Sequence, residues 1–148
     1  MTIPDPAARA AGSGQRDLTD ALVQASFAVM AVLNRVGAEH DLSLTQLRVL
    51  AILRDRRGRM SDLADYLGLD KSTISGLVDR AEKRGLVQRG PNPDDGRAVD
   101  VFLTPAGARL AEQGAVQIAR ALSGLTGQLS PAESRRLTAL LERMLAAR

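Results

Sequence analysis

The chain has 148 residues, of which 45% are apolar and only 2% aromatic, and its formal net charge at pH 7 is +3. This length is enough to bury one core built from Leu, Val, Ile and Ala, as helical proteins do. The absence of cysteine excludes disulfides, thiolate metal sites and cysteine-based redox sensing. No segment is expected to cross a membrane and no signal peptide is expected at the start, so we expect a soluble, cytoplasmic protein.

The first part of the chain predicts a tail followed by one long helix. Residues 1–15 are rich in Ala, Pro and Gly, and we expect them to form a flexible tail. From Asp17 to Glu39 the apolar residues advance in steps of three and four, which predicts a helix roughly 35 Å long. A small domain cannot cover such a length, so part of the apolar face is expected to meet another element or chain. That face carries Leu18, Leu22, Ala25, Val29, Val32 and Val36.

A second, shorter helix is predicted after Ser43. Ser43 and Gln46 have the spacing of a capping box, in which each side chain accepts a hydrogen bond from the other residue's main chain. The predicted buried face of this helix carries Leu44, Leu47, Leu50, Ala51 and either Leu53 or Arg54.

The stretch from Met60 to Gly85 has the pattern of two short helices joined by a tight turn. Ser61 is expected to cap the first helix and Gly68 to end it, because glycine readily adopts the left-handed backbone conformation. Asp70 is expected to cap the second helix. Apolar residues recur at helical spacing on one side of it, at Ile74, Leu77, Val78 and Ala81. This arrangement predicts a helix-turn-helix.

The other side of the second helix is small and hydroxyl-rich, with a cation at each end. Small side chains let a helix approach base edges in the major groove, and hydroxyls and cations donate to bases or phosphates. Groove contacts are therefore predicted at Ser72, Thr73, Ser75 and Arg80, and phosphate contacts at Lys71, Lys83 and Arg89. The alternative is that the Ser and Thr residues near the helix start only cap it, as in many all-helical proteins.

After Gly85 the apolar pattern changes to a period of two. Residues 90–96 are a loop of turn formers, and after them one face of the chain carries Val99, Val101 and Leu103, which alternate with Ala98, Asp100 and Phe102. This period of two predicts an edge hairpin. Arg97 lies at its tip, where an arginine can enter a narrow minor groove. Asp95 is expected to hold the Arg97 guanidinium by a charge-assisted pair. The alternative is that Arg97 is an ordinary solvated loop arginine.

Together these motifs resemble the MarR family of winged helix-turn-helix regulators. The resemblance rests on S-D-L-A-x-x-L-G, then D-K-S-T-I-S-G-L-V-D-R-x-E-x-R-G-L-V, then D-x-R-x-x-x-x-x-L-T-x-x-G. It implies a mainly α fold with a small β-wing, in which residues 43–104 form the DNA-binding domain. Gly96 and Asp100 depart from the family, which often has basic residues there, so this wing is expected to grip DNA less strongly.

Both ends of the chain are expected to form a helical dimerisation region, residues 16–42 and 105–148. Thr104 with Pro105 and Ser130 with Pro131 each give the start signal of a helix. The apolar stripes of these helices exceed what one small domain buries, which favours a two-fold homodimer over the alternative, a monomeric bundle. Such a dimer would bind a pseudo-palindromic duplex with half-sites about 10 bp apart.

The resemblance also implies an effector, a small aromatic or phenolic anion bound between the dimer helices and the winged domain. Asn34, His40 and Arg48 are polar residues near the first two helices that are candidates for such a cleft. The alternative is that these residues are surface or capping residues. No cofactor and no metal site are expected.

The sequence also bears on two other classes of function. An enzyme is not expected, because the single His has no nucleophile motif around it and no metal-ligand spacing appears. A winged helix that binds only another protein is the remaining alternative, and salt separates it from DNA binding, since phosphate contacts weaken steeply with ionic strength. The sequence therefore predicts a double-stranded DNA-binding transcriptional regulator, a repressor rather than an activator.

Overall fold

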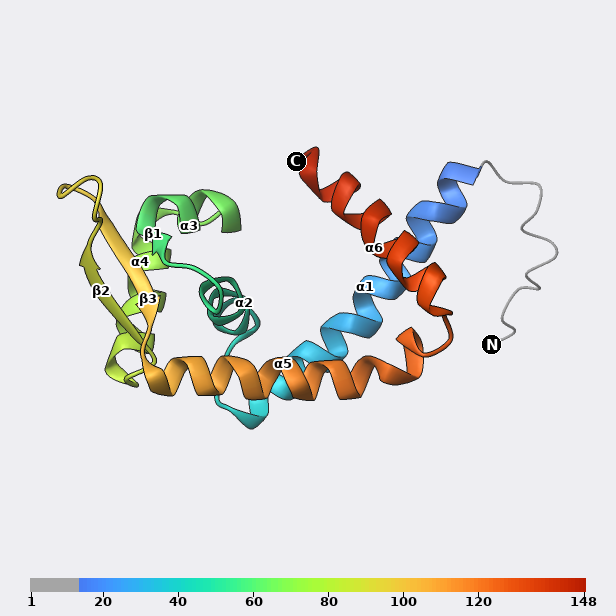
Figure 1. Cartoon of the computed structure of the whole chain (residues 1–148), viewed down its shortest axis with the longest axis horizontal. Helices are drawn as coiled ribbons and strands as arrows, with labels where there is room; N and C mark the ends of the chain where they lie inside the picture. The colour runs from blue at the N-terminus through green and yellow to red at the C-terminus, as the bar shows by residue number, and fades with distance from the viewer. Residues whose placement is uncertain (1–13) are drawn as a thin grey trace.

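The computed structural model describes residues 14–148, which fold into six helices and a small three-stranded sheet. Figure 1 shows the winged domain at one end of an elongated molecule, the helices α1 and α6 at the other, and α5 running between them. The mainly α fold with a small β-wing is confirmed. In chain order the elements are α1 (Gly14–Glu39), α2 (Leu44–Leu53), β1 (Gly58–Arg59), α3 (Met60–Leu67), α4 (Lys71–Lys83), β2 (Val87–Pro91), β3 (Val99–Leu103), α5 (Pro105–Thr126) and α6 (Pro131–Ala146).

The predicted tail, residues 1–15, lies outside the described residues except for its last two. Gly14 and Gln15 belong to α1, so the helix begins earlier than the apolar pattern from Asp17 indicates. α1 ends at Glu39, as predicted.

Most of the predicted helix starts are confirmed. The Asp70, Thr104 and Ser130 side chains each accept a hydrogen bond from a main-chain N–H in the first turn of the helix that follows. Ser43 and Gln46 form the predicted capping box. Gly68 ends α3 in the left-handed conformation, with φ of 66°.

The predicted cap of α3 is wrong. Ser61 lies inside the helix, and Arg59 occupies the N-cap position without a side-chain hydrogen bond to the helix. The reason is a strand that the apolar pattern does not reveal, because Gly58 and Arg59 pair with β3 as the two-residue strand β1. The chain thus passes directly from the sheet into α3.

The hairpin exists as predicted, but its second strand is not an edge. The strand order is β1-β3-β2, so β3 has an antiparallel neighbour on both sides. Val101 at its centre is fully buried and Asp100 is 3% exposed, whereas Val99 is 43% exposed. The predicted alternation of buried and exposed residues therefore fails at Val99, which is exposed, and at Asp100, which is buried. A charged residue thus lies inside the sheet.

The core of the winged domain is formed by α2, α3, α4 and the sheet, and α5 packs against both α2 and β3. The predicted inner face of α4 is confirmed, since Ile74, Leu77, Val78 and Ala81 are all buried. The predicted face of α2 is only partly right. Leu44 and Ala51 are exposed, and the residues buried on α2 are Leu47, Val49, Leu50 and Leu53.

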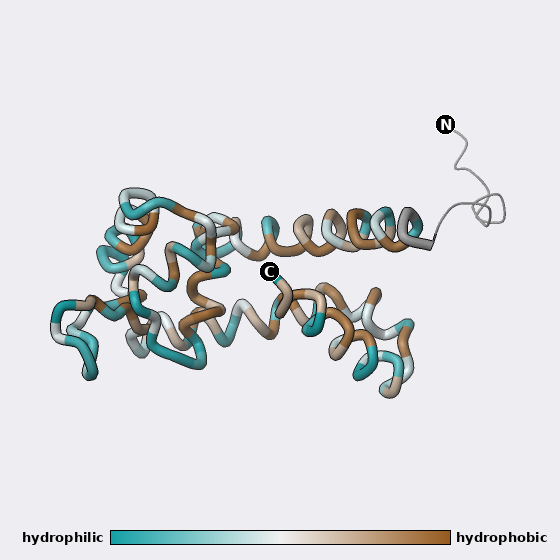
Figure 2. The backbone as a smooth tube through the Cα atoms, turned by 90° about the horizontal axis from the view of Figure 1, so that it is seen from above, coloured by the Kyte–Doolittle hydropathy of each residue, from teal (hydrophilic) through white to brown (hydrophobic). Residues whose placement is uncertain are grey.

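The outer helices carry apolar side chains that no other part of the described chain buries. Phe27 of α1 is 67% exposed, while Val32 and Val36 near the end of that helix are buried. None of the 16 residues of α6 is buried in the described structure. Figure 2 shows hydrophobic segments along both helices, which project away from the winged domain. The exposed apolar residues of α6 are Leu137, Leu140, Leu141, Met144 and Leu145.

The expectation that no segment is long enough to cross a membrane is wrong, because α1 contains a segment whose length and composition would allow it. Among the described residues, the 23-residue segment Asp17–Glu39 contains an 18-residue window with a mean hydropathy of 1.4, and 17% of that window is buried. The reason is that residues 21–34 carry no charge. An interface between two chains also needs apolar residues on a long exposed helix, so the same composition suits a protein partner.

Replacing Gly107 with alanine is expected to destabilise the junction between α5 and β2. A Cβ at Gly107 would lie 1.9 Å from the Leu86 carbonyl oxygen, so the backbone must shift, and overpacking of this kind costs about 1–3 kcal/mol. Urea unfolding of Gly107→Ala measures this loss. Gly124→Ala is the control, because a Cβ there meets nothing within 4 Å in the described structure and should leave stability equal or higher. Equal stability of the two variants would contradict the close contact.

Candidate nucleic-acid interface

The N-terminus of α4 is organised by Asp70. Its Oδ1 accepts hydrogen bonds from the Thr73 main-chain N–H at 2.7 Å and from the Ser72 hydroxyl at 2.9 Å. These bonds, with that from the Thr73 main chain the largest cause, lower the pKa of the Asp70 carboxyl below its usual range. The Ser72 hydroxyl hydrogen is thus already used within the cap, and Ser72 offers an outside partner only the acceptor side of its oxygen.

The remaining predicted residues of α4 lie on its exposed side. Lys71, Thr73, Arg80 and Lys83 are exposed, and Ser75 is half-buried. The Arg80 side chain runs along the surface of α4 toward Gly76, since a Cβ at Gly76 would be 3.4 Å from Arg80 Nη1. The missing side chain at Gly76 therefore leaves room for the Arg80 guanidinium at the helix surface.

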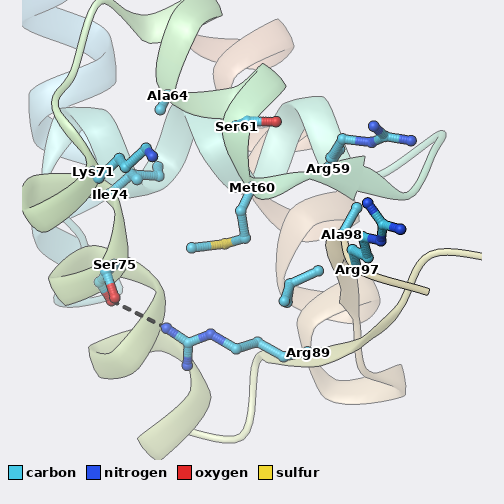
Figure 3. A pocket seen from close by; sticks show the side chains of 11 residues that line it. Arg59, Met60, Ser61, Ala64, Lys71, Ile74, Ser75, Arg89, Arg97 and Ala98 are labelled. Atoms are coloured by element: carbon cyan, nitrogen blue, oxygen red, sulfur yellow. Dashed lines mark hydrogen bonds between the residues drawn. The ribbon is translucent and has the colours of Figure 1, made fainter. Parts of the chain in front are cut away.

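Arg89 does not have the free guanidinium that a phosphate contact needs. Its Nη2 lies 2.7 Å from Asp79 Oδ1, and its Nη1 lies 3.0 Å from Glu82 Oε1. Nη2 also donates to the Ser75 carbonyl at 3.3 Å, the contact marked in Figure 3. The side chain crosses from β2 to α4, where Asp79 and Glu82 neutralise its charge.

The predicted ion pair between Asp95 and Arg97 is replaced by a different contact. Asp95 Oδ1 accepts a hydrogen bond from the main-chain N–H of Arg97 at 3.1 Å, while the described structure gives no Asp95 ion pair with the guanidinium within 4.0 Å. A two-residue separation favours this turn geometry, in which an aspartate bonds to nearby backbone. The exposed Arg97 side chain is therefore carried by an ordered turn and is not itself held by Asp95.

A depression of about 530 Å³ lies between α3, α4 and the wing. Four of the nine residues of the predicted DNA-binding site line it, namely Lys71, Ser75, Arg89 and Arg97. Figure 3 shows them around the cavity with side chains that the sequence does not single out for DNA contact, Arg59, Met60 and Ser61. Their positions follow from the undetected strand β1, which brings the start of α3 beside the wing. The DNA-contact roles of the nine residues stay predictions.

The residues proposed for an effector cleft have different surroundings. His40 Nε2 lies 2.6 Å from Gln117 Oε1, between the end of α1 and α5. Arg48 instead lines a pocket of about 600 Å³ beside α2, β1 and α3, and neither Asn34 nor His40 lines that pocket. The lining includes five arginines, Arg48, Arg54, Arg56, Arg57 and Arg59, together with Tyr66.

Tyr66 lies between two guanidinium groups. Arg48 Nη2 donates to the Tyr66 hydroxyl at 3.1 Å, and the Arg148 guanidinium lies 5.0 Å from the ring centroid. The hydrogen bond and the positive charge of Arg48 lower the pKa of the Tyr66 phenol below its usual range. Within residues 14–148, no group of three or more His, Cys, Asp or Glu side chains is placed to hold a metal ion.

Comparisons with known proteins agree on one family. A family model described as the MarR family matches residues 40–98. The chain is 33% identical to the HTH-type transcriptional repressor NicR of Pseudomonas putida over 117 residues, which cover 78% of this chain and 73% of NicR.

Two solved structures share the fold at 28% sequence identity and a TM-score of 0.67. One is a MarR mutant from E. coli complexed with operator DNA, and the match covers 87% of this chain and 94% of that one. The other is BpsR of Bordetella bronchiseptica, whose DNA binding is regulated by 6-hydroxynicotinic acid, with 85% and 91% covered.

Proposed function

The chain belongs to the MarR family of winged helix-turn-helix transcriptional regulators, and we propose that it is a repressor that covers an operator in double-stranded DNA. The expectation that it is a regulator and not an enzyme is confirmed by its relatives. The observation that carries the proposal is the depression between α4 and the wing, where Lys71 and Arg97 flank a mostly apolar floor. A cytoplasmic location follows from a role on DNA.

The proposed roles divide between α4 and the wing. Thr73, Ser75 and Arg80 face the major groove, with Ser72 acting only as an acceptor, and Lys71 and Lys83 contact phosphates. Arg97, which lies on an ordered turn, enters the minor groove, because a narrow minor groove attracts an arginine side chain. Arg89 is removed from the phosphate contacts, because Asp79 and Glu82 already neutralise it. It positions α4 against the wing instead.

The functional unit of the proposal is a homodimer formed by α1, α5 and α6. The support is the apolar surface that α1 and α6 leave exposed, which is larger than scattered single residues would give. A two-fold axis through these helices gives the dimer two symmetry-related copies of α4, one for each half of the operator. The operator is therefore a pseudo-palindrome with half-sites about 10 bp apart. Residues 43–104 are then the DNA-binding part, and residues 16–42 and 105–148 the dimerisation part.

Arg97→Ala is expected to weaken operator binding by about 1–3 kcal/mol while leaving the fold and the dimer intact, because only a groove contact is removed. Fluorescence anisotropy with a duplex selected from a random pool measures the affinity. Arg120→Ala removes the same charge from an exposed position on α5 and should bind like the wild type. The wild-type affinity should fall steeply with salt. Unchanged binding by Arg97→Ala would reject the wing contact.

Removing residues 131–148 is expected to give monomers, because α6 supplies exposed leucines whose burial drives association. Sedimentation velocity of the full and shortened chains measures the oligomeric state. Arg97→Ala serves as the dimeric control. A dimer that persists without α6 would show that the chain ends do not form the interface.

The proposed regulation is release from DNA by a small aromatic anion, bound in the arginine-lined pocket beside Arg48 and Tyr66. Its volume is within the range of small-molecule sites. Arg54 is paired with Asp55 and Glu112, and Arg57 with Asp100, so Arg48 is an arginine there without a carboxylate partner within 4.0 Å in the described structure. A guanidinium in this state is suited to a carboxylate, and Tyr66 to an aromatic ring.

Arg48→Ala is expected to raise about tenfold the concentration of salicylate or 6-hydroxynicotinate that releases the operator, since a charge-assisted hydrogen bond is lost. Titration of the protein–duplex complex with each compound measures release. Asn34→Ala is the control, because Asn34 does not line the pocket, and it should respond like the wild type. A stronger effect of Asn34→Ala than of Arg48→Ala would place the effector elsewhere.

A further inference from the structure

Asp100 is a buried carboxylate in the central strand of the wing. Its side chain is 4% exposed, and its Oδ2 lies 3.3 Å from Arg57 Nε. Its Oδ1 accepts a hydrogen bond from Asn92 Nδ2 at 2.9 Å. A buried charge is tolerated only when it is paired and hydrogen-bonded, and both oxygens of this carboxylate meet that condition. The expectation that Asp100 simply weakens the grip of the wing treats it as a free charge, which it is not.

From Asp100 a chain of hydrogen bonds runs outward to the tip of the wing. Asn92 Oδ1 accepts from the main-chain N–H groups of Asp94 at 2.9 Å and Asp95 at 3.0 Å. Asp95 Oδ1 in turn accepts from the main-chain N–H of Arg97. The backbone that carries Arg97 is thereby connected to the carboxylate in the sheet through two side chains.

On the other side, Asp100 is anchored by a residue outside the hairpin. Arg57 precedes β1, its Nη2 donates to the Pro91 carbonyl at 3.4 Å, and its guanidinium lies 4.3 Å from the centroid of the Phe102 ring. Gly90 makes this stacking possible, because a Cβ there would be 3.2 Å from Phe102 and 3.4 Å from Arg57. Arg57 therefore contacts both strands of the hairpin as well as the carboxylate.

We propose that Asp100 is a positioning residue for DNA recognition: held by Arg57, it orders the turn through Asn92 and so presents Arg97 to the minor groove. An ordered turn strengthens binding because less conformational entropy is lost when Arg97 meets DNA. The inference rests on the proposed minor-groove role of Arg97. Asp100 itself touches no DNA in this scheme.

The sign of one substitution separates positioning from simple electrostatics. Asp100→Asn removes a negative charge from a DNA-binding hairpin, which by charge alone raises affinity for DNA. If Asp100 positions Arg97, the substitution should instead lower the affinity for DNA about three- to tenfold, because the ion pair with Arg57 that anchors the turn is lost. Asp94→Asn is the matched control, because it removes the same charge from the same hairpin while only the Asp94 main-chain N–H belongs to the network. Its affinity for DNA should stay equal or rise.

A double-mutant cycle on the full chain with the selected duplex completes the test. Asp100→Asn and Asn92→Ala should each weaken binding by wild-type Arg97 and have less than about a twofold effect in the Arg97→Ala background. Asn92 is only half-buried, so Asn92→Ala keeps the test open should Asp100→Asn unfold. Equal losses in both backgrounds, or a gain of affinity by Asp100→Asn, would overturn the inference. Wild-type affinity of Arg97→Ala would remove its premise, whereas absence of any duplex binding by the wild type would refute the proposed function itself.

Discussion

The structure depends on how α4 is fixed to the sheet. Its apolar side is buried in the core of the winged domain, and Arg89 reaches from β2 to the Ser75 carbonyl, Asp79 and Glu82. Burial of Ile74, Leu77 and Val78 supplies most of the stability of this contact, at about 25 cal/mol per Å² of apolar surface. The Arg89 bonds add direction, since a planar guanidinium with several partners restricts how the helix can rotate. An outer side of α4 with a defined orientation is the condition for reading a groove.

The arginines of the winged domain divide into those that hold the fold and those left for a ligand. Arg57 and Arg89 are tied to carboxylates, and Arg84 donates to the carbonyls of His40 and Asp41 between α1 and α2. Arg97 on the wing and Arg80 on α4 are exposed. In the described structure, Asp79, Glu82 and Asp100 are paired with structural arginines, so these three carboxylates do not offset the charge of the exposed Arg80 and Arg97 at close range.

The winged domain is packed against the outer helices through α5. Helix α5 packs against α1, α2 and β3, so it joins the outer helices to the sheet that carries the wing. The arginine-lined pocket beside α2 and α3 includes Arg57, the residue that holds Asp100 in the wing. A ligand that binds Arg57 in that pocket would be linked to the turn that carries Arg97 through Asp100 and Asn92.

By itself the sequence determined the local elements: the caps at Ser43, Asp70, Thr104 and Ser130, the turn at Gly68 and the buried side of α4 all follow from residue type and spacing over a few positions. Only the tertiary structure decided which charges are free. Arg89 and Asp100 have the local pattern of surface residues, yet their partners lie up to 43 positions away along the chain. The strand β1, which makes Arg59 and not Ser61 the N-cap of α3, is likewise formed by pairing with a distant strand. Periodicity reports on neighbours along the chain, whereas ion pairs and strand pairing depend on residues that only folding brings together.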